Sequence, residues 1–270
     1  GDRIPMDGRQ VALSRLVMSS QFAIFLAAAA GGWIADSIGW RSAFGLVLAV
    51  TLAAFVMTAI WLQPQPNAHR PALSIANMRK GYAEVLANPI STICYGGVFI
   101  EGLAIYGMMP FIAGRLEGLG LGGLTEAGLV IGAMSIGGIA FTFAVGRLLA
   151  WFGRTAIIRV AGAVCALALA LFVMSNSWQQ QAACFALLGF GFFMVHNSLQ
   201  AIATELAPRV RGSAVALFAF SLFLGQALGP IVYAPAFTTL GPHAPLLIAA
   251  ALMAVMTVVV AHFLARETRT

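Results

Sequence analysis

The most informative shortage in this 270-residue sequence is charge. Only 9% of its residues are charged, whereas an ordinary soluble domain carries about 25%. Hydrophobic residues make up 60% of the chain, so there are too few polar side chains to cover a water-facing surface. The composition excludes a soluble globular protein and indicates an outer surface that contacts lipid.

The sequence also lacks the motifs of common catalytic and metal sites. It has no nucleotide-binding glycine loop, no HExxH pair and no hydrolase nucleophile motif. Its three cysteines, Cys94, Cys165 and Cys184, lie inside apolar runs without CxxC or Cys/His spacing. We therefore expect small buried thiols, no metal, no cofactor and no enzymatic activity.

Long apolar runs dominate what is present. Each is long enough to cross the hydrocarbon core as a helix, and none shows the alternation in stretches of about ten residues that a β-barrel needs. The prediction is an all-α integral membrane protein with eight transmembrane helices. These segments are 11–35, 41–62, 90–113, 124–150, 155–175, 178–206, 211–237 and 243–265.

The longest polar stretch, 63–89, contains four prolines, which is typical of a linker. Its later part, 74–87, is compatible either with a short helix on the membrane surface or with a solvated loop.

The basic residues are distributed unevenly between the two sides of this arrangement. With the N-terminus in the cytoplasm, thirteen fall inside and two outside, which is the bias expected of a membrane protein. The net charge of +6 is therefore a signal of topology, and no basic face exists on a soluble domain to bind nucleic acid. We expect a multi-pass protein of the cell (inner) membrane with both ends cytoplasmic. The inside residues are Arg3, Arg9, Arg15, Arg70, Arg79, Lys80, Arg147, Arg154, Arg159, Arg209, Arg211, Arg266 and Arg269, and the outside residues are Arg41 and Arg115.

The first and seventh segments resemble each other. Residues 5–13 read PMDGRQVAL and residues 208–217 read PRVRGSAVAL, an offset of about 200 residues or six helices. Two six-helix halves would give this period, and we then expect four helices ahead of the first segment. The chain would hold helices five to twelve, and it should not transport alone. Its predicted parts are 1–62, the last two helices of the first half; 63–89, the cytoplasmic central loop; and 90–270, the second half.

Three motifs resemble those of the major facilitator superfamily, over essentially the whole chain. GRLLAWFGR at 146–154 is similar to the family's cytoplasmic loop motif, with Ala150 at the acidic position. GQALGP at 225–230 is similar to its Gly-Pro helix motif, and APRVRGSAVALF at 207–218 to its loop-to-helix entry. The resemblance implies a partial bundle of two pseudo-symmetric halves that works by alternating access. It implies a conformational role for Gly146, Arg147, Gly153, Arg154, Arg211, Gly212, Gly225, Gly229 and Pro230.

The run 196–220 resembles bacterial efflux permeases, so export of a small molecule coupled to protons is the leading expectation. The fifth helix of the antiporter branch usually carries a Gly-Pro pair, but FLAAAAGGW at 25–33 has no proline, which weakens an assignment to antiport. GxxxG spacing at Gly128 and Gly132, and at Gly225 and Gly229, predicts close helix packing.

Several polar residues inside apolar segments are candidates for a substrate or proton pathway. Glu101 lies midway along 90–113, where an ionisable group is costly and usually functional. His196, Asn197, Gln200 and Thr204 fall within an arc of about 100° on one helix, a stripe that would suit a water-filled cavity.

Gln226 is a further candidate for the pathway, and Glu205 is expected to pair with Arg209 one turn on. Two alternatives stay open. They are a membrane-embedded enzyme that uses Glu101 and His196, and a membrane fragment that does not transport.

Overall fold

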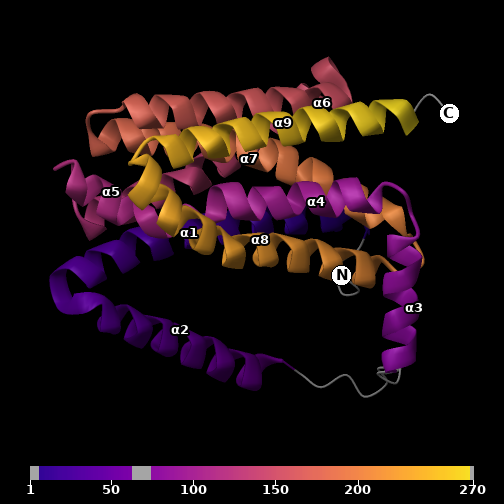
Figure 1. Cartoon of the computed structure of the whole chain (residues 1–270). Helices are drawn as coiled ribbons and strands as arrows, with labels where there is room; N and C mark the ends of the chain where they lie inside the picture. Colours follow the sequence, from indigo (N-terminus) through magenta and orange to yellow (C-terminus); the bar gives the residue numbers. More distant parts are fainter. Residues whose placement is uncertain (1–5, 63–73, 268–270) are drawn as a thin grey trace.

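The computed structural model describes residues 6–62 and 74–267, with side chains for 18–62 and 74–266. Over these ranges the chain is helical and contains no strand, and its long helices lie side by side (Figure 1). The helices are α1 (Met6–Ile34), α2 (Trp40–Trp61), α3 (Ile75–Leu86), α4 (Ser91–Glu101), α5 (Ile112–Gly118), α6 (Leu124–Met174), α7 (Trp178–Leu206), α8 (Arg211–Leu240) and α9 (Ala244–Glu267). Wider π-helical turns occupy Ala35–Gly39 and Gly102–Tyr106, and a short 3₁₀ turn occupies Met109–Phe111.

Six helices in the described ranges are long and apolar enough to cross a membrane, two fewer than the eight segments predicted. They are Met18–Trp61, Ser91–Gly118, Leu124–Met174, Trp178–Leu206, Arg211–Leu240 and Ala244–Arg266. The first and third, of 44 and 51 residues, each contain two of the predicted segments. The all-helical membrane class is confirmed, and the count differs because helical structure continues through two sharp turns.

Both turns occur at glycines with positive φ. Gly39 has φ 106°, and α1 and α2 diverge there as the two arms of a V (Figure 1). Gly153 has φ 70° and ψ 168°, a conformation that costs a residue with a Cβ more than it costs glycine. The two limbs of α6 then both reach the same part of α7: Met134 packs on Gly189, and Ala161 packs on Gly191. The chain therefore folds back on itself at Gly153.

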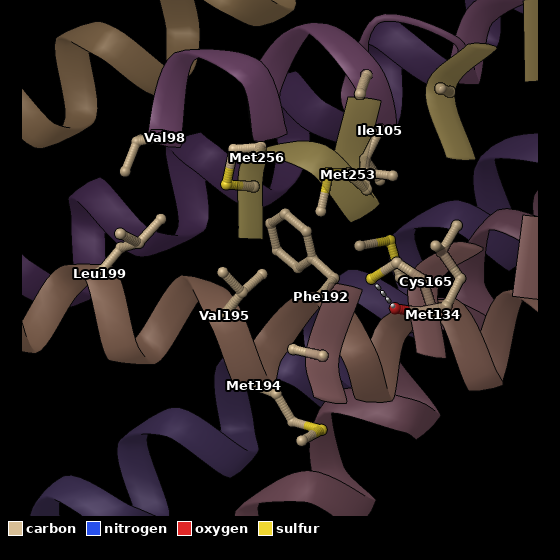
Figure 2. Packing of buried hydrophobic residues seen from close by; sticks show 14 of the residues in the cluster. Val98, Ile105, Met134, Cys165, Phe192, Met194, Val195, Leu199, Met253 and Met256 are labelled. Carbon is tan, nitrogen blue, oxygen red and sulfur yellow. Dashed lines mark hydrogen bonds between the residues drawn. The ribbon is translucent and has the colours of Figure 1, made fainter. Parts of the chain in front are cut away.

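The buried core gathers around α7. Its Phe192, Val195 and Leu199 lie among Met253 and Met256 of α9 (Figure 2). Cys165 and Met134 of the two α6 limbs complete the cluster, and the Cys165 thiol donates to the carbonyl of Leu188 at 4.0 Å. Cys94 is buried as well, whereas Cys184 is half-buried.

Small residues allow the helix backbones to approach closely. A Cβ on Gly225 would lie 2.8 Å from the amide nitrogen of Leu103, and one on Gly132 would lie 3.1 Å from the Phe25 ring. The first contact joins α8 to the end of α4, and the second joins α6 to α1. Both glycine pairs thus form the close crossings that their spacing predicts.

Two helices stand apart from this core. None of the residues of α2 is buried, and the helix leans away from its neighbours (Figure 1). Helix α3 runs across the ends of the long helices (Figure 1), with Gly81 against Ser213 of α8. Of the two alternatives left open for 74–87, a short helix and a solvated loop, the structure shows the helix. The first part of the predicted linker, 63–73, lies outside the described residues.

The basic residues of the described elements gather at one end of the bundle. Helix α3 lies at the end where α8 begins and α9 finishes (Figure 1). Arg79, Lys80, Arg211 and Arg266 belong to these elements. The short helix α5, which holds Arg115, lies at the opposite end.

Candidate proton site in the helix bundle

Glu101 ends the regular part of α4, immediately before the π-helical turn. In that turn the amide of Gly107 donates to the carbonyl of Gly102 at 3.0 Å, five residues back. The Glu101 side chain is fully buried, with 0% exposed. Single π-helical turns are rare and occur often at functional sites, so the local backbone marks the same position as the buried carboxyl.

Close contact with α8 holds this turn in place. A Cβ on Gly102 would lie 3.0 Å from the Gln226 amide nitrogen, and one on Gly107 would lie 2.6 Å from the Gly229 Cα. The two glycines at the ends of GLAIYG therefore let the wide turn press against a neighbouring backbone. This contact fixes the segment that follows Glu101.

His196 of α7 provides the partner of Glu101. Its Nδ1 lies 2.9 Å from the Glu101 Oε2, and 14% of its side chain is exposed. The imidazole stacks on Phe192 at 5.1 Å and 19°, and Phe218 meets its edge at 5.1 Å and 65°. Phe193 closes another side at 6.4 Å. Three aromatic rings thus fix the imidazole against the carboxyl.

Glu101 and His196 together contain the chemical groups that a proton-binding site needs. Imidazole and carboxyl groups can both bind and release protons, and the 2.9 Å between Nδ1 and Oε2 is a hydrogen-bond distance. The other carboxyl oxygen, Oε1, is buried without a hydrogen-bond partner. Such a group has capacity for one more contact, which a proton or a water molecule would fill.

The rest of the predicted polar stripe does not join this pair. Asn197 and Gln200 are exposed, and the Thr204 hydroxyl donates to the Ala201 carbonyl of its own helix at 2.7 Å. Gln226 is exposed on α8. The stripe was predicted to suit one water-filled cavity, and of its four residues only His196 hydrogen-bonds to a side chain of α4.

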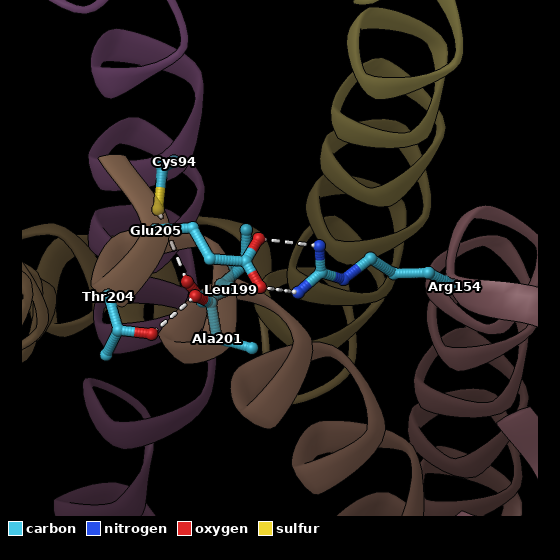
Figure 3. Close-up of polar contacts among 6 residues, drawn as sticks. All are labelled: Cys94, Arg154, Leu199, Ala201, Thr204 and Glu205. Atoms are coloured by element: carbon cyan, nitrogen blue, oxygen red, sulfur yellow. Dashed lines mark hydrogen bonds and ion pairs between the residues drawn. The ribbon is translucent and has the colours of Figure 1, made fainter. Parts of the chain in front are cut away.

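The loop motif supplies a second polar contact, near the Gly153 turn. Arg154 donates to both carboxylate oxygens of Glu205 at 2.8 and 2.9 Å (Figure 3). The predicted pairing of Glu205 with Arg209 is wrong, because α7 ends at Leu206 and Ala207 leaves helical geometry at φ −146°, ψ 82°. Arg209 is therefore not one helical turn away, and Arg154 takes its place.

The remaining motif residues fall into two groups: some are exposed on the surface, and the others lie where α8 crosses α4 and the turn that follows it. Gly146, Arg147, Arg211 and Gly212 are exposed. Gly225 is buried against α4, and Gly229 is buried against the π-helical turn and Gly107 that follow α4, with Pro230 next in the helix. The exposed group lies near helix ends and the buried group lies within a contact between helices. Within the described ranges, no cluster of three His, Cys, Asp or Glu residues could hold a metal ion.

Sequence reasoning missed two features. One is the Arg154–Glu205 pair, which joins residues 51 positions apart and leaves no local spacing to detect. The other is the burial of Arg115, which was counted only as an outside charge, although its side chain is 6% exposed. The only signal of enclosure in the sequence is the density of apolar residues around Arg115.

Comparison with known families agrees with this arrangement. The family model described as Major Facilitator Superfamily matches residues 1–230 and again 169–270. No curated protein matches the chain. The match covers more than half of the chain, and the helices are long and apolar enough to cross a membrane. The chain therefore belongs to the major facilitator superfamily, whose members transport small molecules across membranes.

Proposed function

We propose that this protein exports a small molecule in exchange for protons, and that Glu101 and His196 bind the coupling proton. The main support is the 2.9 Å distance between Glu101 Oε2 on α4 and His196 Nδ1 on α7. Ionisable groups within membrane helices are rare and commonly belong to ion pathways or proton relays. Both residues were selected from the sequence separately, and the structure brings them together.

The burial of the pair supports an occluded stage of an alternating-access cycle. Glu101 has no exposed surface, so a proton on it cannot exchange with bulk water in this conformation. A small shift of α4 relative to α7 would expose it. The glycine-lined crossing of α4 with α8, at Gly225 and Gly229, is a surface on which such a shift meets few side chains.

The ion pair near Gly153 has a place in the same cycle. Arg154 and Glu205 are 42% and 60% exposed, and an exposed pair contributes about 0–1 kcal/mol. We infer that this weak contact joins α6 and α7 at the cytoplasmic end in one conformation and opens in another. The other residues of the loop and helix motifs would guide the same movement.

The uneven placement of basic residues supports an orientation in the inner membrane. Helix α3 and the ends of α8 and α9 would face the cytoplasm, because their end carries most of the basic residues of the described elements. The same assignment makes 63–89 a cytoplasmic loop between 1–62 and 90–270. The apolar, unburied face of α2 would then contact lipid or further helices of the same protein.

Replacement of the carboxyl tests the proposal directly. The complete transporter is reconstituted in proteoliposomes that contain ethidium as probe, with or without an imposed pH gradient. In Glu101→Gln we expect loss of gradient-driven ethidium movement, because the amide cannot release a proton. Ethidium exchange without a gradient should persist, since the change keeps the shape of the side chain.

Glu117→Gln is the matched control, because Glu117 is an exposed carboxyl on α5. It should transport as the unmodified protein does. Gradient-driven flux that is unchanged in Glu101→Gln would remove this carboxyl from the mechanism.

A further inference from the structure

Arg115 is a buried cation without a matching charge. It lies in α5, at the end of the bundle opposite α3, and 6% of its surface is exposed. Its Nη2 donates to the Val173 carbonyl at 3.4 Å, which is at the long limit of a hydrogen bond. Its Nε and Nη1 are buried without a partner.

No acidic side chain in the described part of the chain compensates this charge. The two ion pairs found there involve Arg154 and His196 instead. The nearest stabilising neighbour is an aromatic ring, since the guanidinium carbon lies 4.8 Å from the centre of Phe172. A cation–π contact of this kind offsets only part of the free-energy cost of burying an ion.

A second unsatisfied polar group lies in the same region. Phe172 packs on Phe185 at 5.0 Å, and Gln181 precedes Phe185 by about one turn of α7. The Gln181 side chain is fully buried, and neither its oxygen nor its nitrogen has a hydrogen-bond partner. Two buried side chains at this end of the bundle, Arg115 and Gln181, thus keep unfilled hydrogen-bonding capacity.

Arg115 also lines an open cavity of about 310 Å³. The other lining residues are apolar or have no polar side chain, so Arg115 is the single charged residue among them. They are Pro110, Phe111, Gly114, Phe237 and Pro242. The cavity lies between the 3₁₀ turn and first turn of α5 on one side and the end of α8 with the following turn on the other.

We propose that this cavity binds an oxyanion carried on an apolar body, with Arg115 holding the anionic group. The planar fork of a guanidinium matches the two oxygens of a carboxylate or phosphate. The aromatic and proline walls would contact the apolar part. An anionic phospholipid and a soluble organic acid share this chemistry, and the site is independent of the proton pair at Glu101.

The test measures binding and needs no transport. The full chain is placed in phosphatidylcholine nanodiscs, and its thermal unfolding is followed as sodium benzoate replaces sodium chloride at constant ionic strength. In a second arm, phosphatidylglycerol replaces part of the lipid. We expect at least one of these anions to raise the unfolding temperature, and benzamide, the uncharged analogue of benzoate, to have no such effect.

Arg115→Met removes the charge at nearly constant length and should abolish the anion-dependent rise. Arg41→Met is the matched control, because Arg41 lies 4.4 Å over the Trp40 ring but is exposed, and it should keep the full response. Arg115→Lys keeps the positive charge but lacks the planar guanidinium. Calorimetry should therefore show that benzoate binds this variant about tenfold or more weakly than the unmodified protein. This second variant keeps the proposal testable if Arg115→Met folds poorly.

The two arms separate the possible sources. A response to benzoate alone identifies a soluble organic anion, and a response to phosphatidylglycerol alone identifies a lipid headgroup. A response to neither anion, or a response that survives in Arg115→Met, would overturn the proposal.

Discussion

At the scale of single residues, the contact between Glu101 and His196 has energetic consequences as well as chemical ones. The contact satisfies one oxygen of the buried Glu101 carboxyl and one ring nitrogen of His196, while the other Glu101 oxygen has no partner. Removal of one member of such a pair leaves a buried polar group unpaired, which costs about 1–3 kcal/mol. Removal of both members avoids that cost.

A double-mutant cycle therefore tests the pair. Glu101→Met and His196→Phe should each lower the free energy of unfolding by about 1–3 kcal/mol. The double variant should be more stable than the sum of the two losses predicts, because it leaves no polar group unpaired. Unfolding in detergent with increasing dodecyl sulfate gives the three values. Losses that simply add, within about 0.5 kcal/mol, would show that the contact contributes no coupling.

The residues themselves were largely readable from the sequence, but their partners were not. Glu101 and His196 stood out because ionisable groups are expensive in apolar helices. Their pairing across 95 positions depends on how α4 and α7 pack. For Glu205, the sequence spacing predicted the wrong partner, Arg209. Because α7 ends at Leu206, the Glu205 carboxylate pairs with Arg154 instead.

At the scale of elements, the distance between neighbouring helix backbones determines which glycines can be replaced by a residue with a side chain. Gly225 and Gly229 of α8 lie against the backbone of α4 and its π-helical turn, whereas Gly96 of α4 faces open space. These three glycines share a helical backbone but differ in surroundings. The crossing of α4 and α8 thus depends on the absence of a Cβ at particular positions.

Gly225→Ala should destabilise the protein by about 1–3 kcal/mol, because its methyl group would overlap the Phe99 carbonyl and force the helices apart. Gly96→Ala is the control, with no atom within 4 Å of its new Cβ. It should be neutral or stabilising by about 1 kcal/mol or less. Thermal unfolding in detergent compares them, and equal stability of the two variants would contradict the close crossing.

At the scale of the whole molecule, most of the basic residues of the described elements lie at one end of the helix bundle, beside α3. Pro208, between α7 and α8, is exposed beside the basic end, and Leu119, after α5, is 41% exposed at the other end. The lengths of the helices between them place these positions on opposite sides of a membrane. The orientation then determines which of the two meets the cell exterior.

Labelling in intact cells tests that orientation. With the native cysteines replaced by serine, we expect a membrane-impermeant maleimide to modify Leu119→Cys directly and Pro208→Cys only after the membrane is permeabilised. The reverse pattern would show that α3 faces outward. Labelling of both positions in intact cells would contradict the separation of the two ends.

The sequence by itself determined the class of this protein, since composition and apolar length follow from residue type alone. It also indicated the family, the close glycine crossings, and Glu101 and His196 as candidate residues. Only the tertiary structure decided that Arg154 pairs with Glu205, that His196 hydrogen-bonds to Glu101, and that Arg115 is buried. The physical reason is that hydrophobicity is a local property of each residue, whereas the partner of a buried polar group depends on which helices pack together.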